Sequence, residues 1–100
     1  MIEEAGFATL EAGTADQAVA LLEARSDIAL LFTDIDMPGS MDGLKLAQVA
    51  HDRWPTIRTL VASGKVRPVA SELPPNSAFL AKPYRGTTLI VQLRSMIAPV

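Results

Sequence analysis

One stretch of the sequence constrains the fold more than any other, because it is apolar and then stops at acidic residues. Residues 28–33 carry five apolar side chains out of six, and Asp34 and Asp36 follow before Pro38 and Gly39. The run is short for a helix and has no polar face, which is typical of a strand buried on both sides in a parallel sheet. Asp34 would then end a central strand, where open α/β sheets bind ligands. The alternative is that Asp34 and Asp36 are turn or capping acids.

Length and composition set the class of protein. One hundred residues, 49% of them hydrophobic, make one small domain (residues 1–100) with a thin margin of stability. The net charge of −2 and the lack of a basic block give no indication of a nucleic-acid or anionic-membrane surface. The chain has no cysteine, and no apolar run approaches the roughly 20 residues of a membrane span. Since the first residues do not resemble a signal peptide either, we expect a cytoplasmic protein without membrane or nucleic-acid contacts.

Helical and strand patterns alternate along the chain. Thr14 and Gln17 have the spacing of a capping box, and Ser40 or Asp42 can cap a second helix. This alternation predicts an α/β fold, with a parallel sheet covered by helices on both faces. We expect strands at residues 7–11, 28–33, 59–63 and 78–81, helices at 14–25, 43–53 and 87–98, and a turn or two of helix near 69–73.

Three of the expected strands end in polar residues, which are Asp34, Ser63 and Lys82. If these strands are parallel neighbours, the three side chains meet at one edge of the sheet. A carboxylate can attack phosphorus, a hydroxyl can donate to a phosphoryl oxygen, and an ammonium can neutralise phosphate charge. The set therefore suits phosphoryl transfer, which usually uses Mg²⁺. Taken singly, Ser63 before Gly64 can be a turn former, and Lys82 a solvated lysine.

In this order and spacing, the motifs resemble the receiver domain of bacterial two-component response regulators, over essentially the whole chain. The resemblance implies a three-layer, flavodoxin-like (receiver) parallel sheet with helices on both faces. It is carried by an apolar strand ending in Asp34, by Met37-Pro38-Gly39 and Asp42-Gly43, by Ser63, and by Phe79 followed by Lys82-Pro83-Tyr84.

The resemblance also implies a role for each of these residues. Asp34 would accept a phosphoryl group from the phosphohistidine of a sensor histidine kinase or a phosphotransfer protein. Ser63 would be the switch hydroxyl, Lys82 the phosphate-pairing lysine, and Phe79 the aromatic whose rotamer reports the state. Asp34 and the backbone carbonyl of Asp36 would bind Mg²⁺. The chain would then be a phosphoacceptor signalling domain, rather than a conventional enzyme, and would act through protein contact.

The sequence departs from the receiver pattern at its start. Receivers begin with a buried strand, an acidic pair that binds Mg²⁺ and a first helix, whereas this sequence begins where that helix ends. Glu3 and Glu4 fit a solvated helical turn better than the acidic pair, so we expect weak Mg²⁺ binding. The absent first strand would lie between residues 7–11 and 28–33. We therefore expect a four-stranded sheet in which these two segments pair directly, or in which a second molecule covers the gap in a homodimer.

Two other functions stay open on the sequence. Asp34-Ile35-Asp36 also resembles the nucleophile motif of haloacid-dehalogenase-like phosphatases, although Pro38 and the lack of an acid after Lys82 fit that family poorly. The other alternative is a degenerate receiver that binds a protein partner and never carries phosphate.

Overall fold

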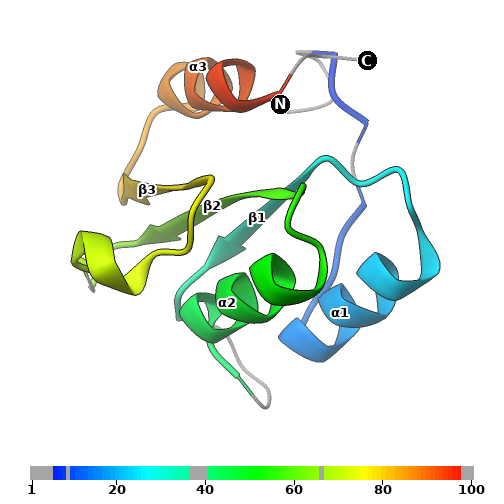
Figure 1. The fold of residues 1–100 in the computed structure, drawn as a ribbon. Coiled ribbons are helices and arrows are strands. Elements are labelled where there is room, and N and C mark those ends of the chain that lie inside the picture. Colours follow the sequence, from blue (N-terminus) through cyan, green and yellow to red (C-terminus); the bar gives the residue numbers. More distant parts are fainter. Residues whose placement is uncertain (1–5, 9, 37–40, 66, 98–100) are drawn as a thin grey trace.

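The computed structural model describes residues 6–8, 10–36, 41–65 and 67–97. Within this part the three strands form one parallel sheet in the order β1-β2-β3 (Figure 1). None of the described helices is long and apolar enough to cross a membrane. The elements are α1 (Ala15–Ala24), β1 (Leu30–Asp34), α2 (Gly43–Arg53), β2 (Arg58–Ser63), the 3₁₀ helix η2 (Ala70–Glu72), β3 (Ser77–Ala81) and α3 (Gly86–Met96).

Helices cover both faces of the sheet, with α1 and α2 on one side and α3 on the other (Figure 1). Successive side chains of a strand point to opposite faces, so each strand contributes to two separate cores. On β2, Leu60 packs in a cluster with Leu89 and Leu93 of α3. Its neighbour Val61 packs with Ala47 of α2. The predicted three-layer, flavodoxin-like α/β fold is therefore confirmed.

The helices begin where the capping residues predict. The Thr14 hydroxyl accepts the backbone N–H of Gln17 at 3.2 Å, and the side-chain oxygen of Gln17 accepts the N–H of Gly13 at 2.6 Å. At α2, the Asp42 carboxylate accepts a backbone N–H of the first turn at 2.9 Å. These bonds satisfy N–H groups that have no partner within their own helix. Ser40, the other candidate cap of α2, lies outside the described residues.

The prediction of a strand at residues 7–11 is wrong, because the described residues of this range form no strand. An alternating pattern is a local property, whereas a strand also needs a neighbour to share its backbone hydrogen bonds. Phe7 is instead buried in the cluster that contains Leu89 and Leu93 of α3, and Leu10 is 50% exposed. The described part of the sheet therefore has three strands rather than four. The helical turn expected at residues 1–5 lies outside the described residues.

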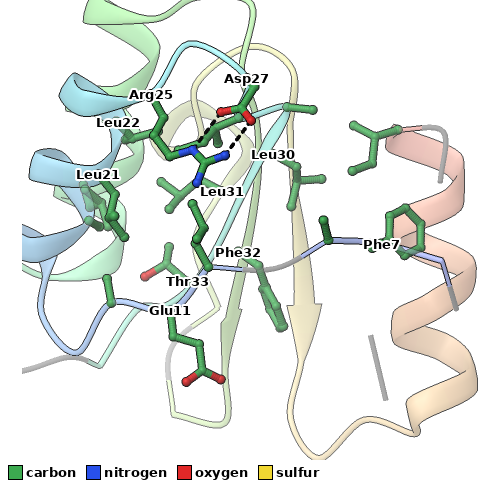
Figure 2. Close-up of a pocket in the computed structure, with 18 of the residues that line it drawn as sticks. Phe7, Glu11, Leu21, Leu22, Arg25, Asp27, Leu30, Leu31, Phe32 and Thr33 are labelled. Atoms are coloured by element: carbon green, nitrogen blue, oxygen red, sulfur yellow. Dashed lines mark hydrogen bonds and ion pairs between the residues drawn. The ribbon is translucent and has the colours of Figure 1, made fainter. Parts of the chain in front are cut away.

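An apolar groove separates residues 7, 8 and 10–13 from β1, with a volume of about 960 Å³ (Figure 2). The Arg25–Asp27 ion pair, 2.7 Å long, lies among the residues that line it. The groove occupies the space in which a further strand was expected, so the described residues 7, 8 and 10–13 do not close the gap to β1. Its lining includes the apolar side chains of Phe7, Leu10, Leu21, Leu22, Leu31 and Phe32.

β1 is the outer strand on the groove side of the described sheet. The carbonyl oxygen of Ala29 accepts from Arg58, and the N–H of Ile35 donates to Ala62, so these two peptide groups point to β2. Peptide groups alternate in direction along a strand. Those of Leu30 and Phe32 therefore point to the groove. This open edge explains why Leu30 and Phe32 are only partly buried, although the sequence predicts a strand buried on both sides.

Candidate functional site

The three predicted site residues meet at the carboxyl ends of the strands. Asp34 is the last residue of β1, Ser63 is the last residue of β2, and Lys82 follows β3 directly. The register pairs Asp34 with Ala62 and Ser63 with Ala81, so the strands end nearly level with one another. The parallel sheet thus brings together residues that are far apart in the sequence.

Lys82 and Asp34 form an ion pair, with 2.7 Å between Lys82 Nζ and Asp34 Oδ1. The hydrogen bond to Asp34 raises the pKa of Lys82 above its ordinary value of 10.5, against a smaller opposing effect of desolvation. The nearby carboxylates of Asp34 and Asp36 raise this pKa further. Lys82 is therefore a cation at neutral pH. The two side chains are 39% and 47% exposed, so the pair is accessible from solvent.

Ser63 contacts a carboxylate that sequence reasoning did not assign to it. Its side chain is buried, and its hydroxyl donates to Asp36 Oδ2 at 3.0 Å. The same hydroxyl oxygen accepts the backbone N–H of Lys65 at 3.0 Å. The sequence suggests only the backbone carbonyl of Asp36 as functional. The sequence does contain one indication of a role for this side chain. Asp36 is two residues after Asp34, so its carboxylate can lie at the same edge of the sheet.

The end of β1 is held by a close approach of α2. The N–H of Gly43, the first residue of α2, donates to the carbonyl oxygen of Ile35 at 2.9 Å. A Cβ atom on Gly43 would overlap the carbonyl oxygen of Asp34, so only glycine fits here. That same oxygen accepts the Thr33 hydroxyl at 3.0 Å. The backbone that presents the Asp34 carboxylate is therefore fixed from several sides.

Two aromatic side chains flank the site on opposite faces of the sheet. Phe79 of β3 is half-buried in the cluster between the sheet and α2, and the guanidinium of Arg67 lies 5.9 Å from its ring centre. On the α3 face, the rings of Tyr84 and Phe32 are 6.3 Å apart and tilted by 57°. Sequence reasoning singled out Phe79 but not Arg67, since Arg67 comes from a loop without a recognisable pattern.

The donor atoms at this edge fit a loosely held Mg²⁺ ion better than a closed metal site. Among the described residues, no group of three or more His, Cys, Asp or Glu side chains could hold a metal. One oxygen of the Asp34 carboxylate is engaged by Lys82, and the Asp36 carboxylate accepts from Ser63, so the backbone carbonyl of Asp36 stays the predicted second ligand. Mg²⁺ often binds through one or two carboxylates while it keeps several waters. Residues 37–40, which include part of the predicted motif, lie outside the described residues.

Solved structures with the same fold identify the family. The chain is 27% identical to a response regulator receiver protein from Sinorhizobium medicae WSM419, with a TM-score of 0.85 over 95% of this chain and 77% of that one. It is 26% identical to the receiver domain of NtrX from Brucella abortus, with a TM-score of 0.81 over 95% of this chain and 82% of that one.

The receiver domain of the hybrid histidine kinase CckA is also similar, with 27% identity and a TM-score of 0.79 over 95% of this chain and 81% of that domain. No protein-family model matches the chain. The structural similarity extends over nearly all of the chain. We therefore identify the chain as a receiver domain of the two-component response-regulator type.

Proposed function

We propose that the chain accepts a phosphoryl group on Asp34 and signals through protein contact. The observation that carries this proposal is the ion pair between Lys82 and Asp34, 2.7 Å long, with Ser63 at the end of the strand between them. A carboxylate nucleophile, a fixed cation and a hydroxyl donor are the groups that phosphoryl transfer to an aspartate requires. The similarity to receiver domains supports this function over the phosphatase alternative.

In the proposed reaction, a carboxylate oxygen of Asp34 attacks the phosphorus of a phosphohistidine. The new O–P bond forms as the N–P bond breaks, and the electron pair of that bond stays with the imidazole, which leaves as the free base after taking up a proton from solvent. Lys82 then pairs with the phosphoryl charge, and the Ser63 hydroxyl donates to a phosphoryl oxygen. Positioning and charge neutralisation are the main contributions that a protein makes to such a transfer.

We propose Mg²⁺ as the cofactor, which the carboxylate of Asp34 and the backbone carbonyl of Asp36 would hold. The ion neutralises charge on the phosphoryl oxygens when it is bound. As phosphoryl donor we propose a sensor histidine kinase or a phosphotransfer protein. Two of the similar structures are a receiver from a hybrid histidine kinase and one from NtrX, which supports a two-component partner in general.

Intact-mass measurement after incubation with Mg²⁺ and acetyl phosphate or phosphoramidate tests the assignment without any kinase. We expect one phosphoryl group on the wild-type protein and none on Asp34→Asn. A matched control is Asp52→Asn, which removes an exposed carboxylate from α2 and should still be phosphorylated. Peptide mapping then places the modification.

Two outcomes would contradict the proposal. A phosphoryl group that persists on Asp34→Asn would move the acceptor to another residue. A wild-type protein that neither becomes phosphorylated nor binds beryllofluoride with Mg²⁺ would favour the degenerate receiver, which only binds a protein partner.

A further inference from the structure

We propose that the carboxylate of Asp36 is a resting-state latch for the Ser63 hydroxyl, which must be released before Ser63 can serve a phosphoryl group on Asp34. This inference rests on the proposed function and concerns the regulation of the same site. In it, Asp36 is a positioning residue that acts through Ser63.

The contact is built into the fold by the way β1 continues past its end. The N–H of Ile35 donates to the carbonyl oxygen of Ala62 at 2.9 Å, so the chain stays attached to β2 for one residue beyond Asp34. Asp36 comes next, beside the end of β2, and its Oδ2 atom lies 3.0 Å from Ser63 Oγ. Asp36 itself is exposed, whereas Ser63 is only 3% exposed. The buried hydroxyl is therefore oriented by a carboxylate at the surface.

A serine hydroxyl has a single proton to donate, and its oxygen can accept two hydrogen bonds. In this structure the proton is directed to Asp36, while the oxygen accepts the N–H of Lys65 at 3.0 Å. A phosphoryl oxygen on Asp34 needs the same proton. The bond to Asp36 must therefore break before the bond to phosphate forms, and the two acceptors compete for one donor.

Lys82 differs from Ser63 in this respect. Its ammonium group carries three N–H donors, so it can keep the carboxylate of Asp34 and contact a phosphoryl oxygen as well. The Ser63 hydroxyl, in contrast, can donate to Asp36 or to a phosphoryl oxygen, but not to both. The Asp36 latch thus opposes the switch step specifically. It would leave the attack by Asp34 and the pairing with Lys82 in place.

The affinity for beryllofluoride in the presence of Mg²⁺ tests the latch. Removing the acceptor in Asp36→Ala should tighten binding about threefold to tenfold, which is the range expected for loss of a competing charge-assisted hydrogen bond at a partly exposed site. Asp36→Asn keeps a neutral acceptor and should give a smaller effect. Asp52→Asn controls for the change in net charge and should bind like the wild type.

The same substitutions in a Ser63→Ala background separate the latch from simple charge repulsion between Asp36 and the phosphoryl mimic. In the Ser63→Ala background, Asp36→Ala should increase the affinity for beryllofluoride much less than it does in the wild type. The increase that remains would come only from removing the negative charge of Asp36. An equal gain in both backgrounds would overturn the latch, as would unchanged affinity in Asp36→Ala itself.

Unfolding is then measured without any phosphoryl mimic for the wild type, Asp36→Ala, Ser63→Ala and the double variant. This measurement distinguishes failure of the latch from failure of the proposed function. If the contact exists, the effects of Asp36→Ala and Ser63→Ala on the unfolding midpoint are not additive. Non-additive unfolding together with no mimic binding by the wild type would refute the phosphoacceptor function, although the contact would stand. Additive unfolding would refute the contact, whatever the affinities.

Discussion

Lys82 Nζ lies 2.7 Å from Asp34 Oδ1, although β2 separates β1, which ends at Asp34, from β3, which Lys82 follows directly. The lysine side chain therefore crosses the end of β2, the middle strand. The site thus extends over the ends of all three described strands. This geometry agrees with the expectation that the two charges lie within reach of each other.

Replacing Lys82 by alanine should separate binding from folding. Because the ion pair is partly exposed, we expect the free energy of unfolding to change by less than about 1 kcal/mol. Binding of beryllofluoride should weaken by about tenfold to a hundredfold, since a charged hydrogen bond to the mimic is lost. Calorimetric titration and urea unfolding measure the two effects. Lys45→Ala, on exposed α2 surface, is the matched control. Equal affinities for the wild type and Lys82→Ala would refute the role of Lys82.

The ion pair should also be visible in the alkaline titration of Lys82. Its pKa is raised above 10.5 in the folded protein, chiefly by the hydrogen bond to Asp34, so the folded state holds this proton more tightly than the unfolded chain does. The resulting stabilisation is fully present below pH 10.5 and is lost as the pH rises through the raised pKa.

NMR titration of the Lys82 side chain in the wild type and in Asp34→Asn measures this shift. We expect the pKa of Lys82 to fall toward its ordinary value in Asp34→Asn and to stay raised in the Asp52→Asn control. A Lys82 side chain that titrates identically in the wild type and in Asp34→Asn would show that the pair does not persist in solution.

Gly43→Ala should disturb the site through the backbone. A Cβ atom at this position overlaps the carbonyl oxygen of Asp34, so α2 and the end of β1 have to move apart. We expect a loss of roughly 1–3 kcal/mol in the free energy of unfolding, together with slower phosphorylation of Asp34. Gly64→Ala is a suitable control, because its Cβ would meet Lys82 Cβ at 3.5 Å, an ordinary contact. If Gly43→Ala is instead more stable, as helix propensity alone would make it, the close approach is not rigid.

The open edge of β1 should promote self-association. The peptide groups of Leu30 and Phe32 point to the apolar groove, and exposed strand edges readily pair with another chain. We expect light scattering to show dimers that increase with concentration. Leu10→Lys places a charge in the groove and should reduce association, whereas Val91→Lys, on the exposed surface of α3, should not. A monomer at every concentration, or equal effects of both variants, would contradict an interface at this edge.

Sequence patterns predict the part of this fold that depends on local rules. Thr14 and Asp42 cap helices because short polar side chains satisfy free N–H groups. Asp34, Ser63 and Lys82 meet because parallel strands end at the same edge. In these cases the residue type and its position relative to an apolar run are enough to predict the helix cap or the strand-end residue.

Other features depend on neighbours that the sequence does not reveal. Residues 7–11 alternate as a strand does, but their described residues do not pair with the open edge of β1, and Phe7 packs against α3 instead. The bond between Ser63 and Asp36 depends on the side-chain torsions of the last residue of β2 and of a residue in the loop after β1. Neither outcome follows from periodicity, since both are decided by contacts that exist only after the sheet has formed.

The succession of parallel strands also has a consequence for the order of events in folding. Each pairing in the sheet closes a long crossover, through α2 between β1 and β2 and through the segment with η2 between β2 and β3. Such non-local pairings form slowly compared with helices. We expect early species in which helices are present while Asp34 and Lys82 are still apart. Stopped-flow circular dichroism, compared with the rate at which beryllofluoride binding appears, would reveal this delay. The ability to bind a phosphoryl group would then appear only when folding is complete.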